Sequence, residues 1–287
     1  MPKTKPIHAH IKGRSGFPPS QQLSTFAGST TGNMALQQEF EQQGNWLFKY
    51  RGQLPVVILV VQLVLYYLQA HDNQLPSDDA VMPASAAFQW NLICLAVVLI
   101  GQVVRCMVIG YTPRNTSGRN TKKQVADVVN STGIYSVVRH PLYLGNFFMW
   151  LGVAMISQNI AFVAIFVLVF WLFYERIMYA EEQFLTRTHG DAYSSWASSV
   201  PAFIPSLSGW KPSPRDFSLR NVLKRESVGF LNIFICFYLT SLTASFARGT
   251  GFQKSDPWLL MLIVSGVITA VIYILRKWTK VLIVEGR

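Results

Sequence analysis

Two apolar runs and the break between them decide the fold: residues 142–157 read LYLGNFFMWLGVAMIS, residues 158–159 read QN, and residues 160–179 read IAFVAIFVLVFWLFYERIMY. Apolar runs of about 18 residues with few charges are typical of membrane-spanning helices. Gln158 and Asn159 interrupt the apolar pattern, as a turn does. We therefore predict two membrane helices that form a tight helical hairpin.

Four further apolar runs flank this hairpin, at residues 54–70, 88–111, 229–246 and 258–275. Together they predict an all-α, polytopic membrane protein with about six transmembrane helices, in which the hairpin supplies the third and fourth spans. The composition agrees, because 51% of the 287 residues are hydrophobic and 14% are charged. A soluble domain carries about 25% charged residues, so the composition excludes a soluble globule.

Most Lys and Arg residues fall on one side of the predicted membrane spans. If both termini are placed inside, the inner segments 1–53, 112–141, 180–228 and 276–287 hold 21 of the 25 Lys and Arg residues. Cytoplasmic loops of membrane proteins carry such an excess. The sorting predicts a multi-pass protein with both termini cytoplasmic, in a bacterial inner membrane or the endoplasmic reticulum. It also explains the net charge of +11 without a nucleic-acid partner.

A first polar stretch, SVVRHPLYLGN at 136–146, lies at the inner mouth of the third span. Pro141 suits the first turn of a helix, because its missing N–H costs nothing there. Arg139 and His140 then stand at a helix N-terminus on the cytoplasmic side, where backbone N–H groups favour an anion such as a carboxylate or phosphate. The alternative is that both side chains simply reach toward the membrane interface.

A second polar stretch, YERIMYAEEQFL at 174–185, ends the fourth span. Ionisable groups at a membrane helix end are costly unless they are paired or face a wet cavity. Here Glu175, Arg176, Glu181 and Glu182 occur within eight residues. The hairpin brings this end back beside Arg139 and His140, so we predict a polar site there. The alternative is an interfacial cluster of salt bridges.

Other residues of the predicted helices carry weaker signals. Gly145 and Gly152 lie seven residues apart on one helical face and leave room for a flat group or for a neighbouring helix. Arg105 lies near the inner end of the second span, where we predict that it snorkels to the interface. The three cysteines have no Cys-x-x-Cys spacing, so we predict structural thiols and no metal site.

Several motifs appear in an order that resembles one family of membrane enzymes. They are Arg139-His140-Pro141-Leu-Tyr143-Leu-Gly145, the pair Glu181-Glu182, and Gly190…Tyr193…Val200-Pro201…Ile204-Pro205. This set resembles the isoprenylcysteine carboxyl methyltransferases and the related phospholipid methyltransferases. The resemblance covers about residues 100–206, and the separations between the motifs match as well as their order.

The resemblance implies a methyltransferase that uses S-adenosylmethionine (SAM) at the cytoplasmic membrane face. In the family, the His and Tyr of the first motif and a Glu of the second hold the cofactor, which implies His140, Tyr143 and Glu181 here. The same pocket would be lined by Leu142, Gly145 and Glu182. The carboxylate of SAM would suit Arg139 and His140, and its amine would suit a glutamate.

The resemblance also implies a lipid or lipid-linked acceptor that enters from the bilayer and presents a carboxylate or another group. We predict that Arg176 orients an anionic acceptor, although it precedes Glu181 by five residues where the family's Arg precedes by four. A local π-bulge or a different task for Arg176 would explain the difference. Met178 and Leu185 are predicted to border the acceptor's opening.

Other functions stay open. Methylation of the amine or phosphate headgroup of a phospholipid or glycolipid is the first alternative, and for an amine it would need Glu175 or His140 as a base. Sterol-type reductases share this general architecture, but nothing here resembles a dedicated NADPH site. A small transporter would carry polar residues near the bilayer midplane, and here they lie at the inner boundary.

The chain divides into four parts on these grounds. Residues 1–33 are rich in Pro, Ser, Thr and Gly and are predicted to be a disordered extension. Residues 34–99 form an N-terminal membrane region, 100–206 the methyltransferase core, and 207–287 a C-terminal region with two further spans. One hypothesis is that translation starts at Met34, which the intact mass of the natively expressed protein tests.

Overall fold

The computed structural model describes residues 35–72, 86–113, 128–284 and 286. The predicted disordered extension 1–33 lies outside the described residues. Within the described ranges the protein is all-helical, with no β-strand and one isolated bridge between Gly133 and Lys211. The prediction of an all-α polytopic protein is confirmed.

Five helices in the described ranges are long and apolar enough to cross a membrane. They are α2 (Leu54–His71), α3 (Ala86–Tyr111), α5 (Ile160–His189), α7 (Leu219–Ala247) and α8 (Pro257–Trp278). The predicted third span is the shorter apolar helix α4 (Pro141–Met155). At 15 residues α4 would extend about 22 Å, less than the thickness of a bilayer core. The total of six spans therefore stays a prediction.

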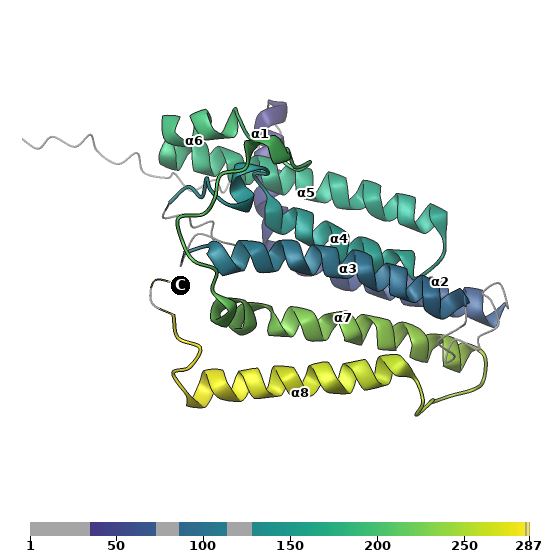
Figure 1. The fold of residues 1–287 in the computed structure, drawn as a ribbon. Helices are drawn as coiled ribbons and strands as arrows, with labels where there is room; N and C mark the ends of the chain where they lie inside the picture. The colour runs from purple at the N-terminus through teal and green to yellow at the C-terminus, as the bar shows by residue number, and fades with distance from the viewer. Residues whose placement is uncertain (1–34, 73–85, 114–127, 285, 287) are drawn as a thin grey trace, which may run out of the picture. The chain divides into compact units, whose positions relative to one another are not determined.

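The helices lie side by side in the order α5, α4, α3, α7 and α8, and α2 packs against α4 and α7 (Figure 1). Residues 156–159 join α4 to α5. Gln158 has a positive φ of 53°, and the Asn159 side chain caps α5 by accepting a 3.0 Å hydrogen bond from the Phe162 N–H. A side-chain cap of this kind satisfies one of the free N–H groups that begin a helix.

Glycines allow α3 and α4 to approach closely. A Cβ at Gly101 would meet the Gly145 carbonyl oxygen, and a Cβ at Gly152 would lie 2.5 Å from the Cys94 carbonyl oxygen. Of the two uses predicted for Gly145 and Gly152, the structure therefore supports the neighbouring helix. Small residues serve the same purpose in membrane helix pairs generally.

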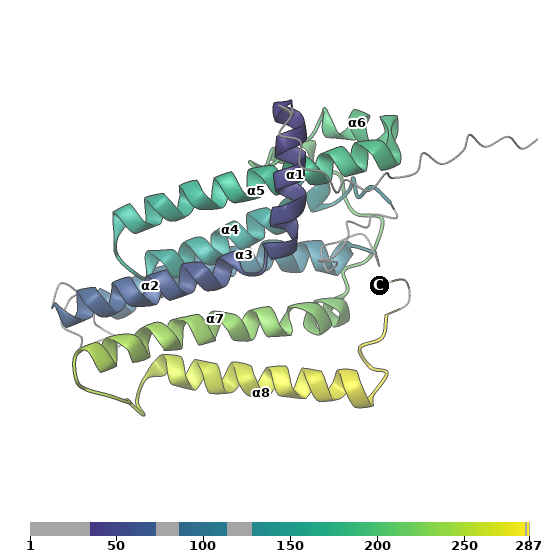
Figure 2. The ribbon, with the colours of Figure 1, turned by 180° about the vertical axis from the view of Figure 1, so that it is seen from behind.

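Helix α1 (Leu36–Tyr50) runs across the other helices instead of along them (Figure 2). It packs on the C-terminal half of α5, where a Cβ at Gly44 would meet the Arg176 carbonyl oxygen and the Ala180 side chain. Only a glycine permits this crossing. Helix α1 therefore lies directly against the part of α5 that carries the predicted site.

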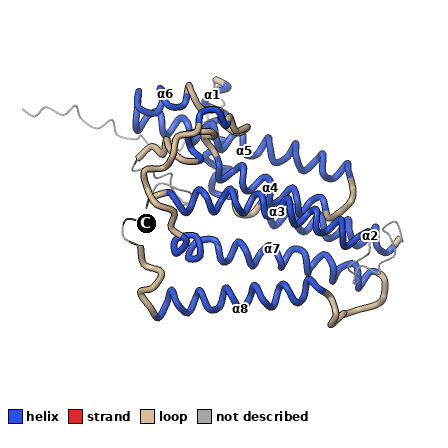
Figure 3. The backbone as a smooth tube through the Cα atoms, in the orientation of Figure 1, coloured by secondary structure: helices blue, strands red, loops and turns tan. Residues whose placement is uncertain are grey.

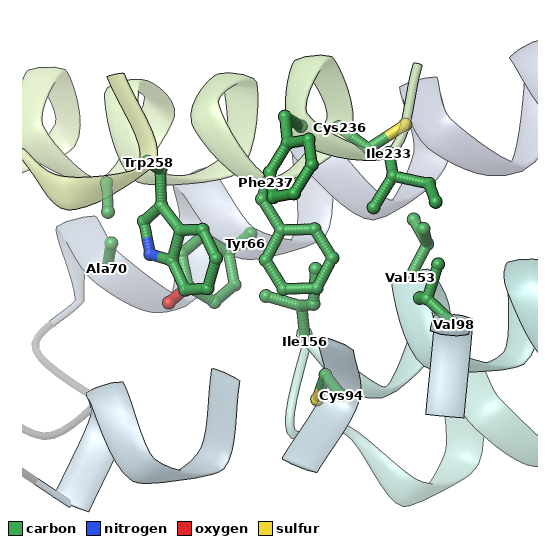
Figure 4. Close-up of a cluster of buried hydrophobic side chains, with 12 residues drawn as sticks. Tyr66, Ala70, Cys94, Val98, Val153, Ile156, Ile233, Cys236, Phe237 and Trp258 are labelled. Atoms are coloured by element: carbon green, nitrogen blue, oxygen red, sulfur yellow. The ribbon is translucent and has the colours of Figure 1, made fainter. Parts of the chain in front are cut away.

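The apolar packing falls into two main clusters. One joins α2, α3, α4, α7 and α8 around Tyr66, Phe237 and Trp258 (Figure 4). The other joins α1, α2, α4 and α5 and includes Phe48 and Phe170. Many apolar side chains remain exposed on the outer faces of the long helices, as lipid-facing surfaces require.

The loops before α4 and after the short helix α6 (Asp191–Ala197) lie close together at the start of α4 (Figure 3). The backbone N–H of Arg139 donates a 2.9 Å hydrogen bond to the Pro201 carbonyl, and that of His140 donates a 3.1 Å bond to Ala202. The N–H of Ser206 donates to the Val137 carbonyl at 2.9 Å. The chain after α6 therefore fixes the entry into α4.

Candidate functional site

The first turn of α4 meets the last third of α5 through Tyr143 and Glu181. The Tyr143 hydroxyl donates a 2.7 Å hydrogen bond to Glu181 Oε1. His140, the N-cap residue of α4, has its Nε2 2.9 Å from Glu182 Oε1 and its Nδ1 3.7 Å from Glu181 Oε2. The imidazole thus lies between the two carboxylates. We call Arg139, His140, Tyr143, Glu181 and Glu182 the carboxylate cluster.

Arg139 ties this cluster to the end of α6. Its Nε donates to Glu182 Oε1 at 2.8 Å, and a second nitrogen donates to Glu182 Oε2 at 3.2 Å. The third nitrogen donates to the carbonyls of Ala197 and Val200. A guanidinium has five N–H donors, so these bonds occupy four of them. Arg139 is a clamp between α5 and the chain after α6 more than a free anion binder.

The local sequence explains why these residues stand where they do. Pro141 occupies the first helical position of α4, where the lack of an N–H is tolerated. Val137, Val138 and Leu144 form a small buried cluster that holds this entry turn. The polar side chains of Arg139 and His140 therefore face α5 from a fixed backbone.

Tyr193 on α6 presents a buried polar group to the same cluster. The residue is 2% exposed, and its hydroxyl has no hydrogen-bond partner among the described residues. The indole N–H of neighbouring Trp196 is also buried without such a partner. Burial raises the pKa of the Tyr193 hydroxyl above its ordinary value, and the charges of Glu182 and Glu181 act in the same direction. Buried donors without partners are rare in folded proteins, so these two fit a bound ligand with acceptor atoms.

Some predicted site residues lie elsewhere. Arg176 donates a 3.0 Å hydrogen bond to Glu175 and a 3.2 Å bond to Gln43 of α1, and its guanidinium lies 4.0 Å above the Phe40 ring. Helix α5 is α-helical throughout, without a π-bulge. Arg176 and Glu175 therefore contact each other and α1, and the contacts described here do not connect them with the carboxylate cluster.

Of the remaining predicted residues, some lie near the carboxylate cluster and one lies between two packed helices. Met178 is buried in the apolar cluster that contains Tyr143, and Leu185 and Leu142 are half-buried. Gly145 faces α3, because a Cβ there would lie 2.7 Å from the Arg105 side chain. Gly145 therefore packs against α3, and its place in the cofactor pocket stays a prediction.

The prediction that Arg105 snorkels to the interface is wrong. Its guanidinium donates two 2.9 Å hydrogen bonds to Glu226 of α7 and one of 2.6 Å to Asn146 of α4. Glu226 is 5% exposed and also accepts a 3.2 Å bond from Gln102. The reason is that α7 begins ten residues before the predicted span at Gly229, which brings an acidic residue to Arg105. A buried charge needs such a partner.

Sequence reasoning missed three contributors: Tyr193 and Trp196 as buried donors, and Glu226 as the partner of Arg105. Tyr193 belongs to the motif set quoted above, but nothing in its spacing indicates an unpartnered hydroxyl. An acidic residue just before an apolar run was the one available signal for Glu226.

Comparison with known proteins identifies the segment that holds this geometry. Residues 89–192 match the family model described as phospholipid methyltransferase. These residues are similar to the phospholipid methyltransferase family. The matched segment runs from the first turn of α3 through α4 and α5 to the start of α6, and it includes the whole carboxylate cluster.

Individual relatives carry the names of two kinds of protein. The chain is 34% identical over 115 residues to the protein-S-isoprenylcysteine O-methyltransferase of Schizosaccharomyces pombe, covering 39% of this chain and 48% of the relative. The enzyme of the same name from Saccharomyces cerevisiae is 32% identical over 120 residues, covering 40% and 48%. The nickel-cobalt-cadmium resistance protein NccN of Alcaligenes xylosoxydans xylosoxydans is 29% identical over 161 residues, covering 56% and 68%.

The chain spans about half the length of the isoprenylcysteine methyltransferases it matches. No solved structure matches the chain. Within the described residues, no group of three or more His, Cys, Asp or Glu side chains is arranged to hold a metal ion.

Proposed function

We propose that this chain is an integral-membrane methyltransferase that uses SAM and methylates a lipid or lipid-linked acceptor. The observation that carries the proposal is the bond between Tyr143 and Glu181, with His140 within reach of the same carboxylate. It places the residues that the family resemblance implies for the cofactor in one cluster. The family and most of its named relatives are methyltransferases, which supports the same reaction.

The residues present fit this cofactor. When bound, SAM supplies a methyl group activated by a sulfonium. Glu181 accepts the Tyr143 hydrogen bond at one oxygen, and the other oxygen, 3.7 Å from His140 Nδ1, can accept from an ammonium group. The unpartnered donors of Tyr193 and Trp196 suit carboxylate or hydroxyl oxygens. The ring of Tyr143 offers an electron-rich face to a cation.

The protein's own residues then have distinct tasks. Tyr143 and His140 orient Glu181, while Arg139 and Glu182 hold α6 against the cluster and limit the access of water. A fixed arrangement of this kind lowers the entropic cost of bringing acceptor and methyl group together. A carboxylate acceptor needs no base, because its oxygen is already an anion.

We place the reaction at the cytoplasmic face. The carboxylate cluster lies at the end of the helices where the basic segments gather in the sequence, and this end is assigned to the cytoplasm by the positive-inside rule. Met178, buried beside Tyr143, and Leu185 are proposed to border the path of the acceptor's apolar chain.

Methylation of a phospholipid headgroup is the second candidate, and the description of the matching family favours it.

Membranes that contain the protein should be incubated with methyl-labelled SAM, and the label in lipid should be separated from the label in protein. Alkali-labile label indicates an ester, and alkali-stable label in lipid indicates an N-methyl headgroup. No label above that of membranes without the protein would contradict both.

A further inference from the structure

Helix α1 reaches the site although it lies outside the family match. Phe40 packs edge-on against Tyr179 and carries the Arg176 guanidinium on its face, and Gln43 accepts a hydrogen bond from Arg176. Near the other end of this contact, Arg187 pairs with Glu41. The side chain of Arg176 therefore anchors α1 on α5.

The anchored helix places a different arginine, Arg51, against the apolar cluster that contains Tyr143. Arg51 follows the last turn of α1, and its guanidinium lies 3.7 Å from the centre of the Phe48 ring. Phe48 is buried in the same apolar cluster as Tyr143, Tyr174 and Met178. The Arg51 charge is close enough to act electrostatically on Glu181, Tyr143 and Tyr174.

Apolar side chains surround this arginine. Leu47 and Leu54 pack partly buried against the cluster that contains Phe48 and Met178. Leu54 begins α2, a candidate membrane span, so these apolar side chains adjoin the lipid-facing surface of that helix. An acceptor with an apolar chain can therefore bring its polar end to Arg51 without leaving the bilayer interface.

We propose that Arg51 binds the anionic oxygen of the acceptor, a carboxylate or a phosphate at the end of an apolar chain, and that Arg176 anchors α1. This inference rests on the methyltransferase function proposed above. A guanidinium stacked on an aromatic ring keeps its N–H fork in one plane, which suits bidentate binding of either anion. Arg51 takes over the task that the sequence assigned to Arg176.

The charge test compares two ligands that differ in one group. N-acetyl-S-farnesylcysteine and its carboxamide are each titrated against the wild type, Arg51→Gln and Arg176→Gln proteins in detergent. The wild type should bind the acid about 10- to 100-fold more tightly than the amide, as a hydrogen-bonded charge contact implies. Arg176→Gln should keep this preference, because the contacts Phe40–Tyr179 and Glu41–Arg187 still hold α1 on α5. Arg51→Gln should bind the two within about twofold, because the charge contact is absent.

A merely structural role for Arg51 would not change this ratio, because both ligands need the same fold. An Arg51→Gln protein that keeps the acid preference, or an Arg176→Gln protein that loses it, would overturn the inference. Arg51→Lys should restore only part of the preference. Lys49→Ala, which removes an exposed charge on the same helix, is the control that should keep the full ratio.

The two proposals fail in different ways. A wild-type protein that binds no SAM overturns the methyltransferase function and this inference with it. A wild-type protein that binds SAM but shows no preference for the acid, and none for dioleoyl phosphatidic acid over dioleoylglycerol, overturns the inference alone. A preference for the farnesylcysteine acid over its amide identifies a carboxylate acceptor. A preference for phosphatidic acid over dioleoylglycerol identifies a phosphate acceptor.

Discussion

The Tyr143 hydroxyl donates a 2.7 Å hydrogen bond to Glu181, and the two residues come from consecutive helices, α4 and α5, joined by four residues. This bond fixes the orientation of the carboxylate that we assign to the cofactor. The two helices approach each other elsewhere through aromatic and aliphatic side chains. We therefore expect ligand binding to depend on the Tyr143–Glu181 hydrogen bond more than on the apolar part of this interface.

Removal of the Tyr143 hydroxyl should weaken cofactor binding. In Tyr143→Phe the Glu181 carboxylate loses its donor, and we expect a loss of about 1–3 kcal/mol in SAM binding, measured by isothermal titration. Tyr273→Phe is the matched control, because Tyr273 is 59% exposed on α8. Equal affinities in the two variants would count against the proposed orientation of Glu181.

Replacing Glu182 should mainly lower the stability of the protein, and replacing Glu181 should mainly weaken SAM binding. Glu182 accepts two hydrogen bonds from Arg139 and contacts His140. Glu182→Gln should therefore destabilise the ligand-free protein by about 1–3 kcal/mol, seen as a lower midpoint of thermal unfolding in detergent. Glu181→Gln should change this midpoint little. The assignment fails if Glu181→Gln is the more destabilised of the two.

Tyr193 offers a test that does not depend on losing a protein contact. Its buried hydroxyl has no partner among the described residues, so Tyr193→Phe should leave the stability of the ligand-free protein unchanged or raise it. SAM affinity should fall by about 1–2 kcal/mol if the hydroxyl binds the ligand. Unchanged SAM affinity would remove Tyr193 from the site.

The same residue makes a prediction about pH. Burial and the negative charges of Glu182 and Glu181 raise the pKa of Tyr193 above its ordinary value. The hydroxyl thus stays protonated well into the alkaline range. The ratio of wild-type to Tyr193→Phe affinity should be constant between about pH 6 and pH 9. A ratio that declines through this range would mean that the hydroxyl ionises there.

The ion pair between Arg105 and Glu226 should be important for stability. Glu226→Gln leaves a largely buried guanidinium without its counter-charge, and we expect a cost of about 3–5 kcal/mol. The double variant Arg105→Met/Glu226→Leu should recover much of this loss. Glu41→Gln, which breaks the exposed pair with Arg187, should cost less than about 1 kcal/mol. Similar midpoints of thermal unfolding for Glu226→Gln and Glu41→Gln would contradict this prediction.

The sequence predicted the parts of the site that depend on local pattern. Pro141 marked the start of α4, and the short break at Gln158 brought the start of one helix beside the end of the next. The convergence of His140 and Glu181 follows from these two features. The five-residue spacing between Arg176 and Glu181 left two readings open, and the continuous α-helix of α5 contains no π-bulge.

The parts that depend on packing between distant segments were not predictable. Arg51 lies on Phe48 of the apolar cluster that contains Tyr143 because Gly44 lets α1 cross α5 closely, and no periodicity in α1 encodes that crossing. Glu226 meets Arg105 across 121 residues of sequence. In both cases the contact depends on how two distant helices pack together. The apolar pattern predicts each helix separately and does not predict that packing.

Equilibrium binding of SAM to the purified protein in detergent, compared between the wild type and Glu181→Gln, tests the central claim most directly. We predict saturable binding to the wild type and an affinity at least about tenfold lower in Glu181→Gln, since a buried charge-assisted hydrogen bond is lost. Absence of binding to the wild type, or equal affinity in the two proteins, would contradict the assignment of this cluster as the methyl-donor site.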